Sequence, residues 1–149
     1  MTLDGSDSIA MDADSLIQSS AGAITIDSAN GGVTVDVVTA NGGGNIIVAA
    51  GSDGTDDAND DLTLTDNVAA FGGTGNINLI AGDTISVPAV TVSAAGTGAV
   101  MLSAGTDFNE GGALQNGTAA GNVTLADGST VSSQDGNITL RAPGNVQIS

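Results

Sequence analysis

The stretch Gly75-Asn76-Ile77-Asn78-Leu79-Ile80-Ala81-Gly82 decides the fold of this chain of 149 residues, because variants of it recur along the sequence. These variants begin at five further glycines: Gly22, Gly44, Gly98, Gly121 and Gly144. From Gly75 onward the step between them is a constant 23 residues. Two and four positions after each of the six glycines stands Ile, Val or Leu. A repeat of this length is typical of solenoids, propellers and helical arrays.

The two aliphatic columns predict a short strand with one inward face, because alternate side chains of a strand point to the same side. Ala-Gly or Asp-Gly pairs follow three of these strands, and glycine suits a tight corner. A second strand is expected around Ile85, Phe108 and Val131. A third is expected around Val90 and Val92, around Leu114, and around Ile138 and Leu140. The sequence therefore predicts an all-β fold, a parallel β-solenoid of about six coils of 23 residues each, as a single module over residues 1–149.

Composition excludes several classes of function. The chain has 17 acidic residues, one basic residue (Arg141), and neither His nor Cys, so its formal net charge is -16. Nucleic acids and anionic membranes are disfavoured as partners, because both attract cationic proteins. Thiol and imidazole chemistry and zinc, haem or iron-sulfur sites lack their ligands. Paired carboxylates of a glycan-active enzyme could come from Asp56 with Asp60 or from Asp83 with Asp107, but solvated turn residues explain all four, and we expect no enzyme.

The phrase G-N/A-[IV]-x-[LVI]-x-A-G, with continuations such as GNINLIAGDTISV and GAVMLSAGTDF, resembles the coils of filamentous haemagglutinin-type exoproteins. These are large adhesins of bacterial two-partner secretion, with autotransporter-like relatives. The resemblance covers the chain from Gly22 to Ser149. It implies a right-handed β-helix shaft, export to the bacterial surface or the extracellular space, and a role in adhesion, with glycans or other host-surface components as partners.

One step departs from the period, because 31 residues separate Gly44 from Gly75. The extra residues coincide with an acidic insertion at 51–61, which interrupts an otherwise regular coil. Its carboxylates are candidate ligands for Ca²⁺, which prefers several oxygen ligands at close range. The candidates are Asp53, Asp56, Asp57, Asp60 and Asp61. The alternative is a solvated, charge-rich loop that maintains solubility.

Asparagine follows four of the six glycines, at Asn45, Asn76, Asn122 and Asn145. Stacked side chains at one corner could hydrogen bond from coil to coil, which predicts a corner ladder. The alternative is that asparagine stands there because it tolerates turn geometry. Three sequons, at Asn116, Asn122 and Asn137, are candidate glycan acceptors, although coincidence explains them in a chain rich in Asn and Thr.

Two further surfaces are candidates for contact with other molecules. Ile47, Ile80 and Met101 are predicted to lie on one outer face in adjacent coils, where an apolar patch would mark a lateral contact. Counting back 23 residues from Gly22 places Met1 and Leu3 in the inward columns, and the chain stops just after Ile148. Both ends are therefore expected in the first strand of a coil, with no cap on either.

These observations predict the structural shaft of a secreted or cell-surface filament or adhesin, in which copies stack head to tail or the coil continues in a longer chain. No cofactor is required. The alternative is a calcium-dependent binding or assembly module that uses the loop 51–61. A glycan-active β-helix enzyme is the remote alternative.

Overall fold

A computed structural model describes residues 1–53, 59–108, 114–116 and 121–149 of the chain. The described residues form short strands joined by corners, and almost all strand pairs are parallel. Three sheets run the length of the molecule, and we name them A, B and C in the order in which the chain first visits them. The strands of sheet A are β1 (Thr2–Gly5), β4 (Ile24–Ser28), β7 (Ile46–Ala50), β10 (Ile77–Ala81), β13 (Val100–Ser103) and β18 (Ile138–Arg141).

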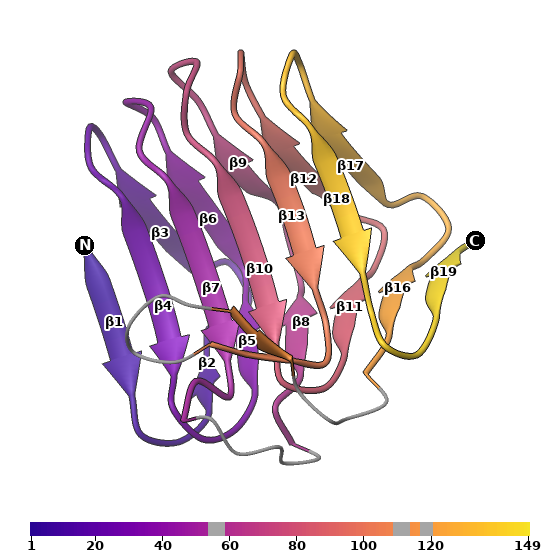
Figure 1. Ribbon diagram of the computed structural model, residues 1–149. Helices are drawn as coiled ribbons and strands as arrows, with labels where there is room; N and C mark the ends of the chain where they lie inside the picture. The colour runs from indigo at the N-terminus through magenta and orange to yellow at the C-terminus, as the bar shows by residue number, and fades with distance from the viewer. Residues whose placement is uncertain (54–58, 109–113, 117–120) are drawn as a thin grey trace.

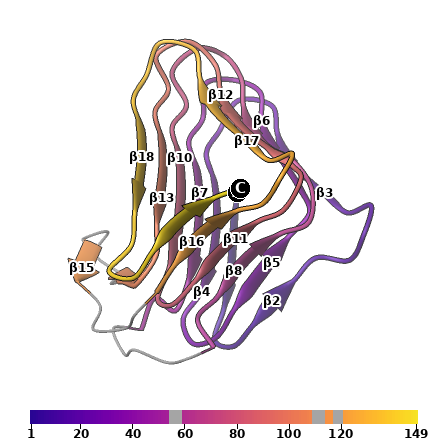
Figure 2. The same ribbon diagram turned by 90° about the vertical axis from the view of Figure 1, so that its right-hand side faces the viewer.

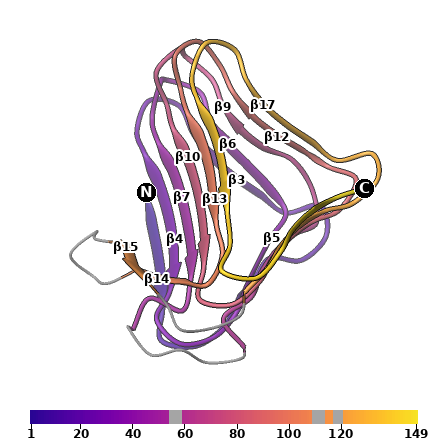
Figure 3. The ribbon, with the colours of Figure 1, turned by 45° about the vertical axis from the view of Figure 1, so that its right-hand side comes forward.

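Sheets B and C complete each coil. Sheet B contains β2 (Ile9–Ala10), β5 (Val33–Val35), β8 (Leu62–Leu64), β11 (Ile85–Val87), β16 (Val123–Leu125) and β19 (Val146–Ile148). Sheet C contains β3 (Leu16–Ser19), β6 (Val37–Ala40), β9 (Val68–Ala70), β12 (Thr91–Ala94) and β17 (Thr130–Ser133). The remaining strands, β14 (Thr106–Phe108) and β15 (Leu114–Asn116), pair antiparallel with each other and lie outside sheet A (Figure 3).

The fold is a parallel β-solenoid of about six coils, as predicted. Each of the first five coils passes through sheets A, B and C in turn, and their strands pair in register with their counterparts one coil away. Figure 1 shows the coils stacked side by side from the N-terminus to the C-terminus, and Figure 2 shows the three sheets as the sides of a triangle. The sixth coil contributes β18 and β19, so sheets A and B have one strand more than sheet C.

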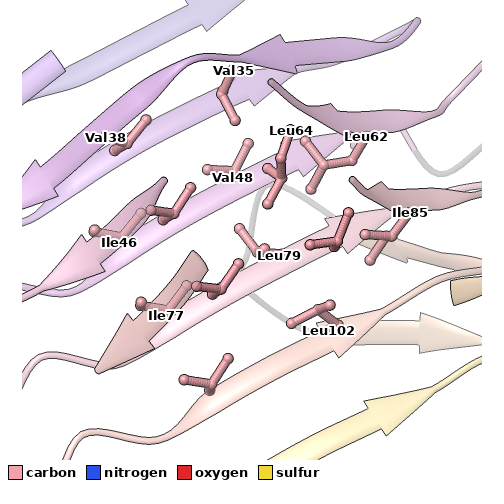
Figure 4. Close-up of a cluster of buried hydrophobic side chains, with 14 of the residues drawn as sticks. Val35, Val38, Ile46, Val48, Leu62, Leu64, Ile77, Leu79, Ile85 and Leu102 are labelled. Carbon is pink, nitrogen blue, oxygen red and sulfur yellow. The ribbon is translucent and has the colours of Figure 1, made fainter. Parts of the chain in front are cut away.

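The core is a set of aliphatic columns inside the triangle, which confirms the inward columns for the first coils. In sheet A one column contains Ile24, Ile46, Ile77 and Val100, all buried. The second column contains Ile26, Val48, Leu79 and Leu102. Side chains from sheets B and C meet these columns from the other two sides (Figure 4). Burial of each such side chain stabilises the fold by about 1.5–3 kcal/mol, so the columns supply most of the driving force.

The last two repeats of the glycine phrase, at Gly121 and Gly144, lie in a different sheet from the one predicted. β16 and β19, which follow Gly121 and Gly144, belong to sheet B, and Val123 pairs with Ile85 rather than with Val100. The strand that continues sheet A is β18, in which Ile138 pairs with Val100 across a step of 38 residues. The hairpin β14–β15 occupies the extra length, so Phe108 and Leu114 do not belong to the second and third strands of a coil. Val131 lies in sheet C, and Leu140 in sheet A.

Glycines that stack on one another at the corner between sheets C and A show which repeats of the glycine phrase are equivalent. A Cβ atom added at Gly44, Gly75, Gly98 or Gly136 would overlap the carbonyl oxygen of the stacked glycine one coil earlier. Only glycine allows so close an approach of two backbones. The column therefore continues from Gly98 to Gly136. A Cβ at Gly121 would instead overlap the carbonyl oxygen of Asp83, because Gly121 lies at the corner between sheets A and B.

Both long insertions lie on the link from sheet A to sheet B. Residues 51–61, the predicted acidic insertion, form the link between β7 and β8, and the hairpin β14–β15 lies on the link between β13 and β16. The same link in other coils is short, at residues 6–8, 29–32, 82–84 and 142–145. One edge of the triangle therefore carries the features that distinguish individual coils.

Candidate functional site

The two ends of the solenoid are the candidate functional site, because the apolar columns open to solvent there. At the N-terminal end the exposed hydrophobic residues are Met1, Leu3 and Leu16. At the C-terminal end they are Ile138, Val146 and Ile148. These six side chains are 38–69% exposed, whereas the core residues of the middle coils are buried.

Five of the six exposed side chains at the ends are members of the inward columns, whereas Leu16 pairs with the half-buried Val37 and points outward from sheet C. Leu3 pairs in register with the buried Ile26, and Ile148 with the buried Leu125. Their exposure therefore arises because no coil covers them from above or below.

The N-terminal end lies in sheet A, as expected, but the C-terminal strand β19 lies in sheet B, so the expectation that both ends lie in the first strand of a coil is wrong. The shift follows from the hairpin β14–β15, which moved Val146 and Ile148 into sheet B.

The corner ladder is present, although its bonds run from backbone to side chain. The backbone N–H of Asn76 donates to Oδ1 of Asn45 at 2.9 Å, and the N–H of Ala99 donates to Oδ1 of Asn76 at 2.8 Å. The N–H of Asn145 donates to Oδ1 of Asn122 at 2.9 Å, but at the corner between sheets A and B. Each bond joins consecutive coils, so the asparagines have a role beyond tolerance of turn geometry.

Asp60 is a structural residue of the acidic insertion. Its side chain is 1% exposed, and its Oδ1 accepts the backbone N–H of Gly31 at 2.8 Å. The carboxylate fills space that glycine leaves open, because a Cβ at Gly51 or Gly82 would overlap or crowd it. A run of acidic residues gave no sign that one of them turns inward. The signal available in the sequence was the pair of glycines that stand at equivalent places, Gly51 and Gly82.

The other predicted calcium ligands do not converge in the described part of the chain. Asp53 and Asp61 are exposed, and Oδ1 of Asp61 accepts the N–H of Thr84 at 3.0 Å. Asp56 and Asp57 lie outside the described residues. Among residues 1–53, 59–108, 114–116 and 121–149, no group of three acidic side chains has the geometry of a metal site. The calcium site stays a prediction.

A groove of about 520 Å³ lies beside the acidic insertion, on the outer side of sheet B. Thr34 and Thr63 are part of its lining, and Asp7, Asn30 and Asp61 border it. Carboxylates, amides and hydroxyls offer hydrogen bonds to a polyol or a hydrated cation. The negative charge of Asp7 and Asp61 disfavours an anionic ligand. The paired carboxylates of an enzyme find no support here, because Asp60 is buried against backbone and Asp56 lies outside the described residues.

The predicted lateral patch does not form. Ile80 points outward from sheet A, but it is 1% exposed, and its neighbours in the same row, Ala49 and Ser103, are also buried. β14 lies against β10 and contributes to the cover over this face. Ile47 and Met101 are half-buried and are separated by Asn78. The sequence does not predict this cover, because Phe108 and Leu114 also fit the expected second and third strands of a coil.

No protein-family model matches the chain, and neither a curated protein nor a solved structure matches it. Within the described residues, no helix has the length and the hydropathy to cross a membrane.

Proposed function

We propose that this protein is a structural shaft of a secreted or cell-surface filament or adhesin, and that it lengthens by stacking coil on coil at its two ends. The observation that supports this proposal most directly is the exposure of the inward columns at both ends, at Met1 and Leu3 and at Val146 and Ile148. In the middle of the solenoid the same columns are covered from both sides.

Two physical terms favour the addition of a coil at each end. The edge strands carry rows of backbone N–H and C=O groups that can pair with a further strand. Covering the apolar side chains contributes about 25 cal/mol for each Å² of surface removed from water. A contact between unlike ends does not close on itself, so its repetition yields a fibre.

The resemblance of the repeated phrase to filamentous haemagglutinin-type coils supports the proposed location outside a bacterial cell. The acidic surface suits a shaft that must stay soluble and keep neighbouring shafts apart. In this proposal the protein has no catalytic role, and its adhesive partners are glycans or other surface components. The solenoid itself acts as a spacer, and the insertions at its corners are the features to which a partner could bind.

Sedimentation velocity and electron microscopy of the purified chain test the stacking. We expect elongated oligomers whose length rises with protein concentration. Ile148→Asp at one end and Leu3→Asp at the other should each abolish association, because both would place a carboxylate in the apolar junction. Circular dichroism should show that both variants keep their strands, since both side chains lie in edge strands and are 38% and 69% exposed in the single chain.

Phe71→Asp is the matched control. Phe71 is a large hydrophobic residue that is 47% exposed, but it lies at a corner between β9 and β10, in the middle of the solenoid. The Phe71 variant should associate as the parent does. A parent chain that stays monomeric at high concentration would overturn the proposed stacking, and so would a Phe71 variant that is impaired as much as the end variants.

A further inference from the structure

One outward row of sheet A carries opposite charges at its two ends. The register aligns six side chains from the first coil to the last: Asp4, Asp27, Ala49, Ile80, Ser103 and Arg141. The two acidic members occupy the N-terminal edge. Arg141, the only basic side chain of the protein, occupies the C-terminal edge.

Arg141 is exposed, and its Nε donates to Oγ of Ser103 at 2.6 Å. This bond ties the guanidinium to the neighbouring member of the row and uses one of its five N–H groups. Asp4, at the opposite edge, is also exposed, and Asp27 stands next to it one coil further in. A charge of each sign is thus presented at the same position of the same sheet, on opposite ends of the molecule.

We infer that the partner at each end is a second copy of this chain, stacked head to tail in the register that sets Arg141 of one copy beside Asp4 of the next. This inference rests on the proposed function and names its partner and its register. Neighbouring strands lie about 4.8 Å apart, so the guanidinium of one edge strand can reach the carboxylate of the other. Cross-strand pairs of opposite charge stabilise such a contact, and like charges destabilise it.

The same register continues the apolar columns across the junction. β18 would lie against β1 of the next copy, which places Leu140 on Leu3. β19 would lie against β2, which places Val146 on Ile9. In each case a column that is buried within the chain acquires its next member.

Sheet C would not pair across this junction. Sheets A and B reach the sixth coil, whereas β17 of sheet C belongs to the fifth. When β1 and β2 are seated on β18 and β19, one strand position stays between β17 and β3 of the next copy. The junction is therefore weaker than a step between two coils of the same chain, and association should be reversible and dependent on concentration.

The ion pair fixes both polarity and register. Stacking of two N-terminal ends would place Asp4 and Asp27 of both copies at one junction without an Arg141 to pair with them, and a slip of two residues along the strand would remove Arg141 from Asp4. Electrostatic complementarity of this kind selects one arrangement among several that bury similar apolar area.

Charge exchange tests the pair. Arg141→Asp and Asp4→Arg should each weaken association by about tenfold, measured as the dissociation constant in sedimentation equilibrium. The double variant keeps the net charge of the parent and should recover parental association to within about twofold. Asp66→Arg, at a corner of the third coil, adds the same charge as Asp4→Arg without touching an end, and it should leave association intact.

Disulfide trapping tests the register independently of the charges. In the inferred junction Thr139 of one copy aligns with Thr2 of the next, so a chain with Thr2→Cys and Thr139→Cys should form covalent polymers on oxidation. A chain with Thr2→Cys and Gln147→Cys should not, because Gln147 lies in sheet B.

The outcomes separate this inference from the proposed function. If the parent associates and Ile148→Asp abolishes association, but the double charge variant stays as weak as either single variant and Thr139 cannot be trapped with Thr2, then stacking stands and the inferred register is wrong. If the parent does not associate at all, both fail. Recovery by the double variant together with selective trapping supports the inference.

Discussion

At the scale of the residue, the glycine column at the corner between sheets C and A sets the repeat. Gly98→Ala should lower the free energy of unfolding by about 2–3 kcal/mol, because the added Cβ overlaps the carbonyl oxygen of Gly75 and the backbone must move. Gly22→Ala is the control, because its Cβ would meet nothing closer than Oγ of Ser19 at 3.6 Å, and its effect should stay within about 0.5 kcal/mol. Neither glycine has a left-handed φ, so steric overlap alone separates the two variants. Urea denaturation measures the difference, and equal destabilisation by both would contradict the column.

At the scale of the element, the sequence was sufficient for the strands and for the inward columns, but not for the order in which the later strands join the sheets. Alternating aliphatics such as Val123 and Leu125 fit the inner face of any of the three sheets, so periodicity alone cannot assign them. A constant step of 23 residues suggested the wrong sheet, because the hairpin β14–β15 shifted the phase of the chain.

The better guide was the phrase Gly136-Asn137-Ile138-Thr139-Leu140, which repeats the motif but breaks the period. Its glycine makes the backbone contact that defines the corner, whereas Gly121 makes a different contact. The exposed columns at the two ends follow from the same periodicity. The buried Asp60 and the cover over Ile80 do not, because both depend on segments that fold back onto the solenoid from outside the repeat.

The cover over sheet A predicts different costs for the same substitution at two outward apolar residues, Ile80 and Met101. Ile80→Asn should lower the free energy of unfolding by about 2–4 kcal/mol, because it buries an amide at a position that is 1% exposed. Met101→Asn should cost less than about 1 kcal/mol, because Met101 is half-buried and its row already contains Asn78. Thermal and urea denaturation of both variants measure this, and equal costs would show that the face of sheet A is open at Ile80.

At the scale of the whole molecule, charge acts over the longest range. A net charge of -16 with one basic side chain repels itself within the chain and between copies. Monovalent salt screens exposed charges, with a Debye length of about 10 Å at 0.1 M. We therefore expect the Tm to rise, and end-to-end association to strengthen, as NaCl increases from about 0.01 M to about 0.5 M. Calorimetry and sedimentation measure the two trends.

Divalent cations separate screening from a specific site in the same titration. Asp60 and Asp61 already accept backbone N–H groups, so we expect CaCl₂ and MgCl₂ to raise the Tm equally at matched ionic strength. A calcium site in the loop 51–61 would instead add a calcium-specific stabilisation, about 2.7 kcal/mol at a concentration one hundred times its dissociation constant. Such a rise, lost in Asp61→Asn, would overturn our expectation and favour the calcium-dependent module. A Tm that falls with NaCl would contradict the repulsion itself, and with it the argument that the acidic surface keeps neighbouring shafts apart.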